Sequence, residues 1–137
     1  MSYLKLKSDE NLYVAQELTG QGRYNTSVHC SYYGCFQFMK CLLCYNLGIS
    51  YDEQDGLKGS DTHDYIFNLF QNRIYNPWLL RSFRIHFLNL KHKRGKADYK
   101  NEIITEEESL TAIEEAKMVI AHLTSVFGAL QLVEDRP

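Results

Sequence analysis

The sequence lacks the features that would identify a membrane, secreted or nucleic-acid-coating protein. Its longest apolar runs, such as residues 41–45, are far shorter than the ~20 residues that a membrane-spanning helix needs. Residues 1–5 contain no apolar stretch typical of a signal peptide. A strong charge of one sign is also missing, because 15 Lys and Arg face 17 Asp and Glu, for a formal net charge of −2. We therefore expect a soluble, cytoplasmic protein without membrane contact, in which any basic site is local.

Proline is scarce, and cysteine is confined to one stretch. With only 2 prolines in 137 residues, long helices are permitted along nearly the whole chain. The cysteines are Cys30, Cys35, Cys41 and Cys44, all within one apolar segment, whereas disulfide frameworks spread cysteines across loops. Cys41 and Cys44 form a C-x-x-C pair, but a structural zinc site needs four ligands and no second pair follows. The sequence predicts free thiols, no metal and no cofactor.

Hydrophobic periodicity predicts a single all-α domain over residues 1–137. No window of strict alternation predicts a strand. Residues 49–59 contain a cluster of acidic side chains and no apolar period, so they are expected to form a loop. The five expected helices are the first, capped by Ser8 and ending near Gly20 and Gly22; the second, over about 24–47; a short third, capped by Ser60 or Asp61; the fourth, from Asn76; and the fifth, opened by a Thr105–Glu108 capping box and apolar to Leu130.

The fourth helix carries an arginine on its apolar stripe. The stripe runs at steps of three and four residues through Leu80, Phe83, Phe87 and Leu90 to Arg94 and Ala97. Asp98 follows Arg94 by one helical turn, so an internal ion pair at the helix end is the simpler interpretation. The alternative is a phosphate-binding guanidinium that the carboxylate holds in place.

Basic residues are concentrated in residues 81–100, where seven cations face the single acid Asp98. Such a segment in a chain of nearly balanced charge indicates a polyanion partner. The candidates for nucleic-acid binding are Arg94, Lys91, Lys93 and Lys96. An alternative is a solvated helix face whose charge is answered by glutamates of the next helix, Glu106, Glu107, Glu108, Glu114 and Glu115.

Four segments carry motifs in a recognisable order. Residues 22–36 place the pair Tyr32–Tyr33 and small residues in a long second helix. Thr62–His63 precedes the short third helix, residues 94–99 have the pattern Arg-x-x-Ala-Asp-Tyr, and residues 104–121 lie in the last helix. Together these motifs resemble the HEPN family (higher eukaryotes and prokaryotes nucleotide-binding), and the resemblance spans about residues 8–130. The resemblance implies an up-and-down helical bundle that often dimerises. Apolar stripes on three helices likewise predict a symmetric homodimer.

HEPN proteins include RNA-cleaving toxins neutralised by a minimal nucleotidyltransferase, components of defence systems, and members without demonstrated chemistry. The resemblance therefore implies a module that binds RNA, a nucleotide or a nucleotidyltransferase antitoxin through the surface around residues 94–99. A toxin–antitoxin or defence system is the implied setting. The alternatives are a metal-independent ribonuclease toxin and a non-catalytic dimerisation subunit, because fold does not settle function.

The ribonuclease branch of the family is typified by an arginine, four to six residues, and a histidine. Arg81 and His86 fit this spacing, but they lie upstream of the motif position and diverge by roughly 140° on a regular helix. At the motif position Arg94 is followed by Asp98 and Tyr99, which makes these three the catalytic candidates. An aspartate and a tyrosine suit acid–base catalysis less well than a histidine, whose pKa lies near neutrality. The sequence leaves enzymatic activity open.

Overall fold

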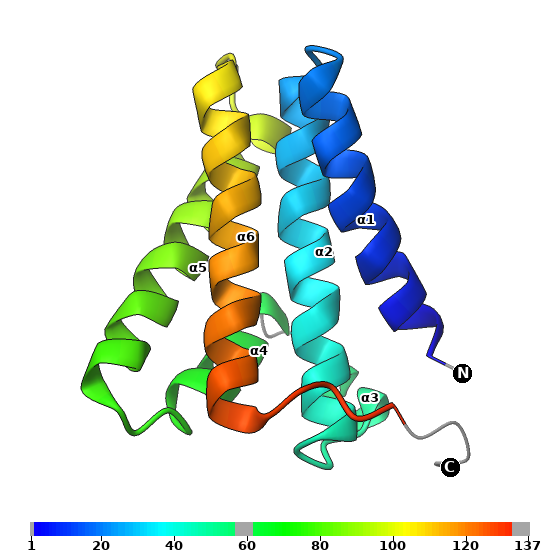
Figure 1. Ribbon diagram of the computed structural model, residues 1–137, viewed down its shortest axis with the longest axis vertical. Helices are drawn as coiled ribbons and strands as arrows, with labels where there is room; N and C mark the ends of the chain where they lie inside the picture. The colour runs from blue at the N-terminus through cyan, green and yellow to red at the C-terminus, as the bar shows by residue number, and fades with distance from the viewer. Residues whose placement is uncertain (1, 57–61, 133–137) are drawn as a thin grey trace.

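The computed structural model describes residues 2–56 and 62–132, which form six α-helices and no strand (Figure 1). The helices are α1 (Tyr3–Gly20), α2 (Tyr24–Tyr45), α3 (Tyr51–Asp55), α4 (Thr62–Gln71), α5 (Pro77–Tyr99) and α6 (Glu106–Phe127). The four long helices α1, α2, α5 and α6 alternate in direction, and the short α3 and α4 lie at the lower end of the view (Figure 1). The expected all-α helical bundle is confirmed.

Helix α2 is the centre of the bundle, because it packs against α1, α5 and α6. Its inward face includes Tyr32, Met39 and Leu42, all without exposed surface. These side chains belong to one hydrophobic cluster with Phe83 and Phe87 of α5. Burying a large apolar side chain stabilises a fold by about 1.5–3 kcal/mol, so this cluster is the main support of the α2–α5 contact.

The first helix begins six residues before the expected start. Ser2, and not Ser8, is the N-cap, and its Oγ accepts a hydrogen bond from the Lys5 N–H at 3.2 Å. Ser8 is buried inside the helix and donates to the Gly34 carbonyl oxygen at 2.6 Å. Helices α1 and α2 approach closely at this contact. Only a glycine fits at position 34, because a Cβ there would lie 2.7 Å from Leu12 Cγ. The hydroxyl at position 8 thus joins two helices and does not start one.

Helix α3 lies inside the segment expected to be a loop. It forms through local capping: Ser50 accepts from the Glu53 N–H, and Asp52 and Glu53 in the first turn favour the positive end of the helix dipole. The buried Gln54 fixes it to the bundle, because its side-chain amide donates to the carbonyl oxygens of Lys40 and Ile49. A helix of one turn has no apolar period, which is why the periodicity missed it.

Most of the expected helix ends agree with the structure. Asn76 caps α5 with Pro77 at its first position, and the capping box of Thr105 and Glu108 opens α6. Helix α6 ends at Phe127, so Leu130 packs against the core from the segment that follows and not from the helix. The expected cap of α4 at Ser60 or Asp61 lies outside the described residues.

Cys30, Cys35 and Cys41 are buried free thiols, and Cys44 is partly exposed. Burial raises the pKa of Cys30, Cys35 and Cys41, which keeps these thiols protonated and unreactive.

Within residues 2–56 and 62–132, no helix combines the length and the hydropathy that crossing a bilayer would need.

Candidate functional site

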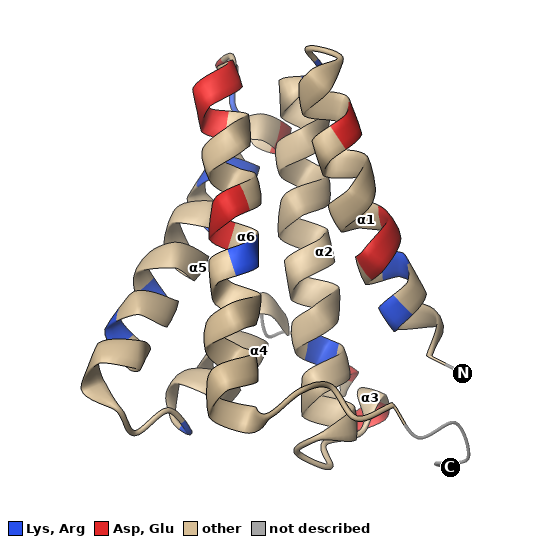
Figure 2. Cartoon of the chain, viewed as in Figure 1, with Lys and Arg blue, Asp and Glu red and all other residues tan. Residues whose placement is uncertain are grey.

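The cations of residues 81–100 are distributed around α5, so they face three different surroundings. Figure 2 shows Lys and Arg along α5, with acidic residues on the neighbouring α6. Arg94 points into the bundle and is 9% exposed. Lys93 points toward α6, and Lys91 and Lys96 lie on the outer side. The four nucleic-acid-binding candidates of the sequence therefore do not share one surface.

Three lysines of α5 pair with carboxylates of other helices. Lys91 Nζ lies 2.6 Å from Asp64, and Lys96 Nζ lies 2.9 Å from Glu108, in pairs that are accessible to solvent. Lys93 Nζ lies 2.6 Å from Glu115, whose side chain is only 7% exposed. Two of these lysines, Lys93 and Lys96, therefore pair with glutamates of α6. This agrees with the alternative interpretation of the basic segment, in which glutamates of the next helix neutralise its charge. The pair of Lys93 is structural, because an enclosed carboxylate needs a partner.

Arg94 lies in a cage of tyrosines and does not pair with Asp98. Its guanidinium carbon is 4.8 Å from the ring centre of Tyr32, 5.6 Å from that of Tyr33 and 5.5 Å from that of Tyr99. Nη1 donates a hydrogen bond to the Tyr99 hydroxyl at 3.2 Å, while Nε has no hydrogen-bond partner among the described residues. Aromatic faces attract a cation, so the cage replaces the expected carboxylate.

Asp98 instead accepts a hydrogen bond from His29 of α2, with Nδ1 and Oδ2 2.8 Å apart. The His29 side chain is 46% exposed, and its ring packs against Tyr33 at 4.7 Å. Through Tyr33, the His29–Asp98 pair lies next to Arg94. A carboxylate on Nδ1 leaves Nε2 of the imidazole available for proton transfer. Sequence reasoning missed His29, because it lies 69 residues before Asp98 and no spacing links the two.

A second histidine borders the same cage. The hydroxyl of Tyr32 and Nδ1 of His63 are hydrogen-bonded at 2.5 Å, and the His63 ring stacks on Phe36 at 4.2 Å. Burial raises the pKa of Tyr32, so its hydroxyl stays protonated. The motif residues Thr62–His63 and Tyr32–Tyr33 are therefore brought together around Arg94. Their contacts form a packed cluster of aromatic rings.

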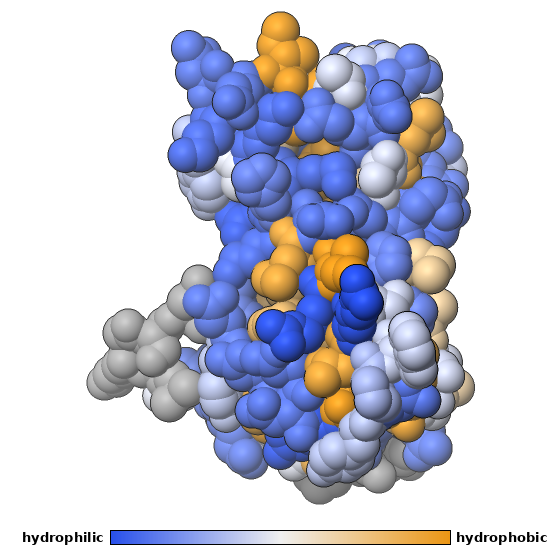
Figure 3. All heavy atoms as spheres, turned by 90° about the vertical axis from the view of Figure 1, so that its left-hand side faces the viewer, coloured by the Kyte–Doolittle hydropathy of each residue, from blue (hydrophilic) through white to orange (hydrophobic). Residues whose placement is uncertain are grey.

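The outer face of α5 is hollowed in two places that share Leu88. Figure 3 shows this face, on which hydrophobic side chains gather among hydrophilic ones. The hollow over the C-terminal half, here called the basic hollow, measures about 500 Å³ and is lined by Leu88, Lys91, His92, Gly95, Lys96, Lys100 and Glu102. Four of its seven lining residues are Lys or His, and one is acidic. No side chain covers its floor at Gly95, where an added Cβ would meet no atom within 4 Å.

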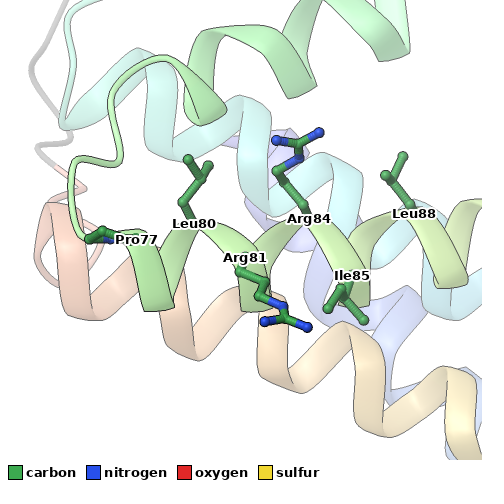
Figure 4. A pocket seen from close by; sticks show the side chains of 6 residues that line it. All are labelled: Pro77, Leu80, Arg81, Arg84, Ile85 and Leu88. Atoms are coloured by element: carbon green, nitrogen blue, oxygen red, sulfur yellow. The ribbon is translucent and has the colours of Figure 1, made fainter.

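The hollow over the N-terminal half, here called the apolar hollow, measures about 470 Å³. All its lining residues belong to α5: Pro77, Leu80, Arg81, Arg84, Ile85 and Leu88. Figure 4 shows Leu80, Arg84 and Leu88 projecting to one side of the helix and Arg81 and Ile85 to the other. The hollow is therefore a groove between two rows of side chains on a single helix.

Polar groups also meet between α5 and α6. The Ser82 hydroxyl lies 2.6 Å from Nε2 of His122 and 3.2 Å from Nδ1 of His86. The pKa of His122 is lowered by burial and by the nearby His86. In the described part of the chain, no three His, Cys, Asp or Glu side chains gather closely enough to hold a metal ion.

Comparison of the chain with family models, with characterised proteins and with solved structures finds no match. The resemblance to HEPN proteins therefore depends on the motifs of the sequence alone.

Proposed function

We propose that this chain is a HEPN-type helical module that binds single-stranded RNA through the basic hollow. The observation that carries the proposal is the charge of that hollow in a chain whose net charge is −2. Lys100 and His92 line it without a carboxylate partner among the described residues. A positively charged groove that follows the phosphate backbone is the usual basis of RNA binding without sequence preference.

The ion pairs at the rim of the hollow leave its lysines available to phosphate. The Lys91 and Lys96 side chains are 25% and 26% exposed, and their carboxylate partners are also in contact with solvent. Exposed pairs of this kind contribute at most about 1 kcal/mol, so a phosphate can displace the carboxylate. Lys93 and Arg94 are excluded from this role by their enclosed partners, Glu115 and the tyrosine cage.

Salt dependence tests the proposal. For single strands the logarithm of affinity falls with the logarithm of salt by a slope of about −0.7 per phosphate contacted. Replacing Lys91, Lys96 and Lys100 with glutamine is expected to remove three contacts and to make the slope shallower by about 2. The matched control replaces three solvent-accessible lysines elsewhere, the partly exposed Lys5 and the exposed Lys7 and Lys117, and should leave the slope unchanged. Equal effects of both triple variants would contradict the proposal.

The second candidate function, a metal-independent ribonuclease, is favoured by the His29–Asp98 pair beside Arg94. A metal-independent cleavage needs a base for the 2′-hydroxyl proton, and an imidazole oriented by a carboxylate suits that task. RNA cleavage in the presence of a chelator should then be lost in His29→Ala and kept in His92→Ala. Retained cleavage in His29→Ala, or no cleavage by the wild type, would contradict the ribonuclease function. Neither result would contradict the proposal that the basic hollow binds RNA.

A further inference from the structure

Two exposed stripes run along opposite edges of the bundle. The α5 stripe consists of Trp78, Arg81, Ile85 and Leu88, and the α1 stripe of Tyr3, Leu6, Glu10, Tyr13 and Glu17. Within each stripe the residues follow one another at steps of three and four. The α1 residues therefore share one face, while the α5 residues follow the apolar hollow, with Leu88 in one of its side-chain rows and Arg81 and Ile85 in the other (Figure 4). This is the pattern of a face that packs against another helix, yet no helix in the described part of the chain covers either stripe.

The apolar side chains of both stripes are unusually exposed for their size. Trp78 is 78% exposed and Tyr13 65%, while Ile85 and Leu88 are each 45% exposed. Beside them lies the apolar hollow, the groove between two side-chain rows of α5. Rows at i and i+4 form the grooves into which the side-chain ridges of another helix pack. The shape of this surface therefore fits a helix.

The charges of the two stripes are opposite. Arg81 and Arg84 border the apolar hollow, and neither side chain has a hydrogen bond or ion pair to a described residue. On α1, the exposed Glu10 and Glu17 likewise have no side-chain partner among the described residues. Figure 2 shows the acidic positions of α1 and the basic positions of α5 at opposite sides of the molecule. The exposed Lys7 lies on the same face of α1 between Tyr3 and Glu10, so this face keeps one net negative charge, opposite in sign to Arg81 and Arg84.

We propose that the α5 stripe of one copy of this chain docks the α1 stripe of a second copy, head to tail. The inference goes beyond RNA binding, since it uses the N-terminal half of α5. This contact differs from the symmetric homodimer that the sequence predicts. A two-fold contact through the α5 stripe would join two surfaces that both carry Arg81 and Arg84, which is unfavourable. Because α1 and α5 do not contact each other and occupy opposite edges, the contact leaves one stripe free at each end of the pair. Such a contact generates rings or open chains.

Two blocking variants test the head-to-tail contact. Ile85→Asp places a carboxylate in the α5 stripe, and Tyr13→Asp places one in the α1 stripe. Each variant alone is expected to weaken self-association by about 100-fold and to remain a monomer, since an unpaired carboxylate is costly in an apolar contact. Mixed together, they should form a dimer that grows no further, because the first keeps an intact α1 stripe and the second an intact α5 stripe. Ile103→Asp, at an exposed position outside both stripes, is the control and should assemble like the wild type.

The measurements are mass by light scattering and sedimentation over a range of concentrations, with circular dichroism to establish folding. The wild type should grow in mass with concentration beyond a dimer, and more at low salt than at high salt. Leu88→Asp with Leu6→Asp provides a second pair should a first variant fail to fold. A wild type that stays monomeric at high micromolar concentration, one that stops at a dimer, or a mixture that does not associate would overturn the proposal.

Discussion

Replacing Arg94 with alanine should destabilise the fold without directly affecting the RNA-binding surface. The side chain makes three contacts with tyrosine rings, at 4.8, 5.5 and 5.6 Å, and one hydrogen bond to Tyr99. Ring contacts of this kind are worth about 0.5–1 kcal/mol each and a hydrogen bond about 1 kcal/mol, which together give about 3 kcal/mol. For a domain of this size, such a loss lowers Tm by roughly 10 °C.

Two comparison variants make this prediction specific. Arg94→Met keeps most of the volume in contact with the tyrosines and removes a cation that is buried without a carboxylate, so it should cost about 1 kcal/mol or less. Arg84→Ala, on the exposed side of the same helix, should change the free energy of unfolding by at most about 0.5 kcal/mol. Urea unfolding followed by circular dichroism measures all three. An Arg94→Ala variant as stable as Arg84→Ala would refute the assignment of Arg94 to the packing of the bundle.

Three further changes probe other contacts. Gly34→Ala should cost about 1–3 kcal/mol of stability, because its Cβ would lie 2.7 Å from Leu12 Cγ, and adding Leu12→Ala should recover part of the loss measured by thermal melting. Lys93→Met should cost about 3 kcal/mol, since the buried Glu115 carboxylate loses its partner, and Glu115→Leu in the same chain should restore stability; additive losses in the double variant would contradict this. The pKa of His122 is lowered in the folded state, so the unfolded chain takes up the proton first and the free energy of unfolding should fall as pH drops below about 6.5. His122→Gln should flatten this part of the stability–pH curve. An unchanged curve would contradict the role of His122 in this pH dependence.

The long helices could be predicted because their signals are local. Asn76 followed by Pro77 and the capping box of Thr105 and Glu108 fix helix starts through contacts within one turn. Ser8 has the same residue type as a cap, yet its hydroxyl is used between helices, at the Gly34 carbonyl. Its role depends on how closely α1 and α2 approach, which is a property of two segments together. Periodicity within one segment carries no such information.

The candidate site was predicted only in part, for the same physical reason. The stripe of α5 predicted that Arg94 faces inward, and its burial confirms this. The expected partner, Asp98, was chosen because it lies one turn away on the same helix. The rotation of α2 against α5 instead brings His29 to Asp98 and the tyrosines to Arg94. Pairings across helices depend on that rotation, so spacing along one helix could not identify them.

Helix α5 has apolar side chains on two sides, and only one of these sides packs inside the bundle. One side, with Phe83 and Phe87, is fully enclosed by the bundle. The other side carries Ile85 and Leu88 at nearly half exposure, although a single bundle needs only one apolar face per helix. Exposed apolar surface that adjoins charges without partners stabilises no contact within the chain, so it is retained at a cost in solubility. The proposed contact with a second copy would cover this second side of α5, which no described helix of the same chain covers.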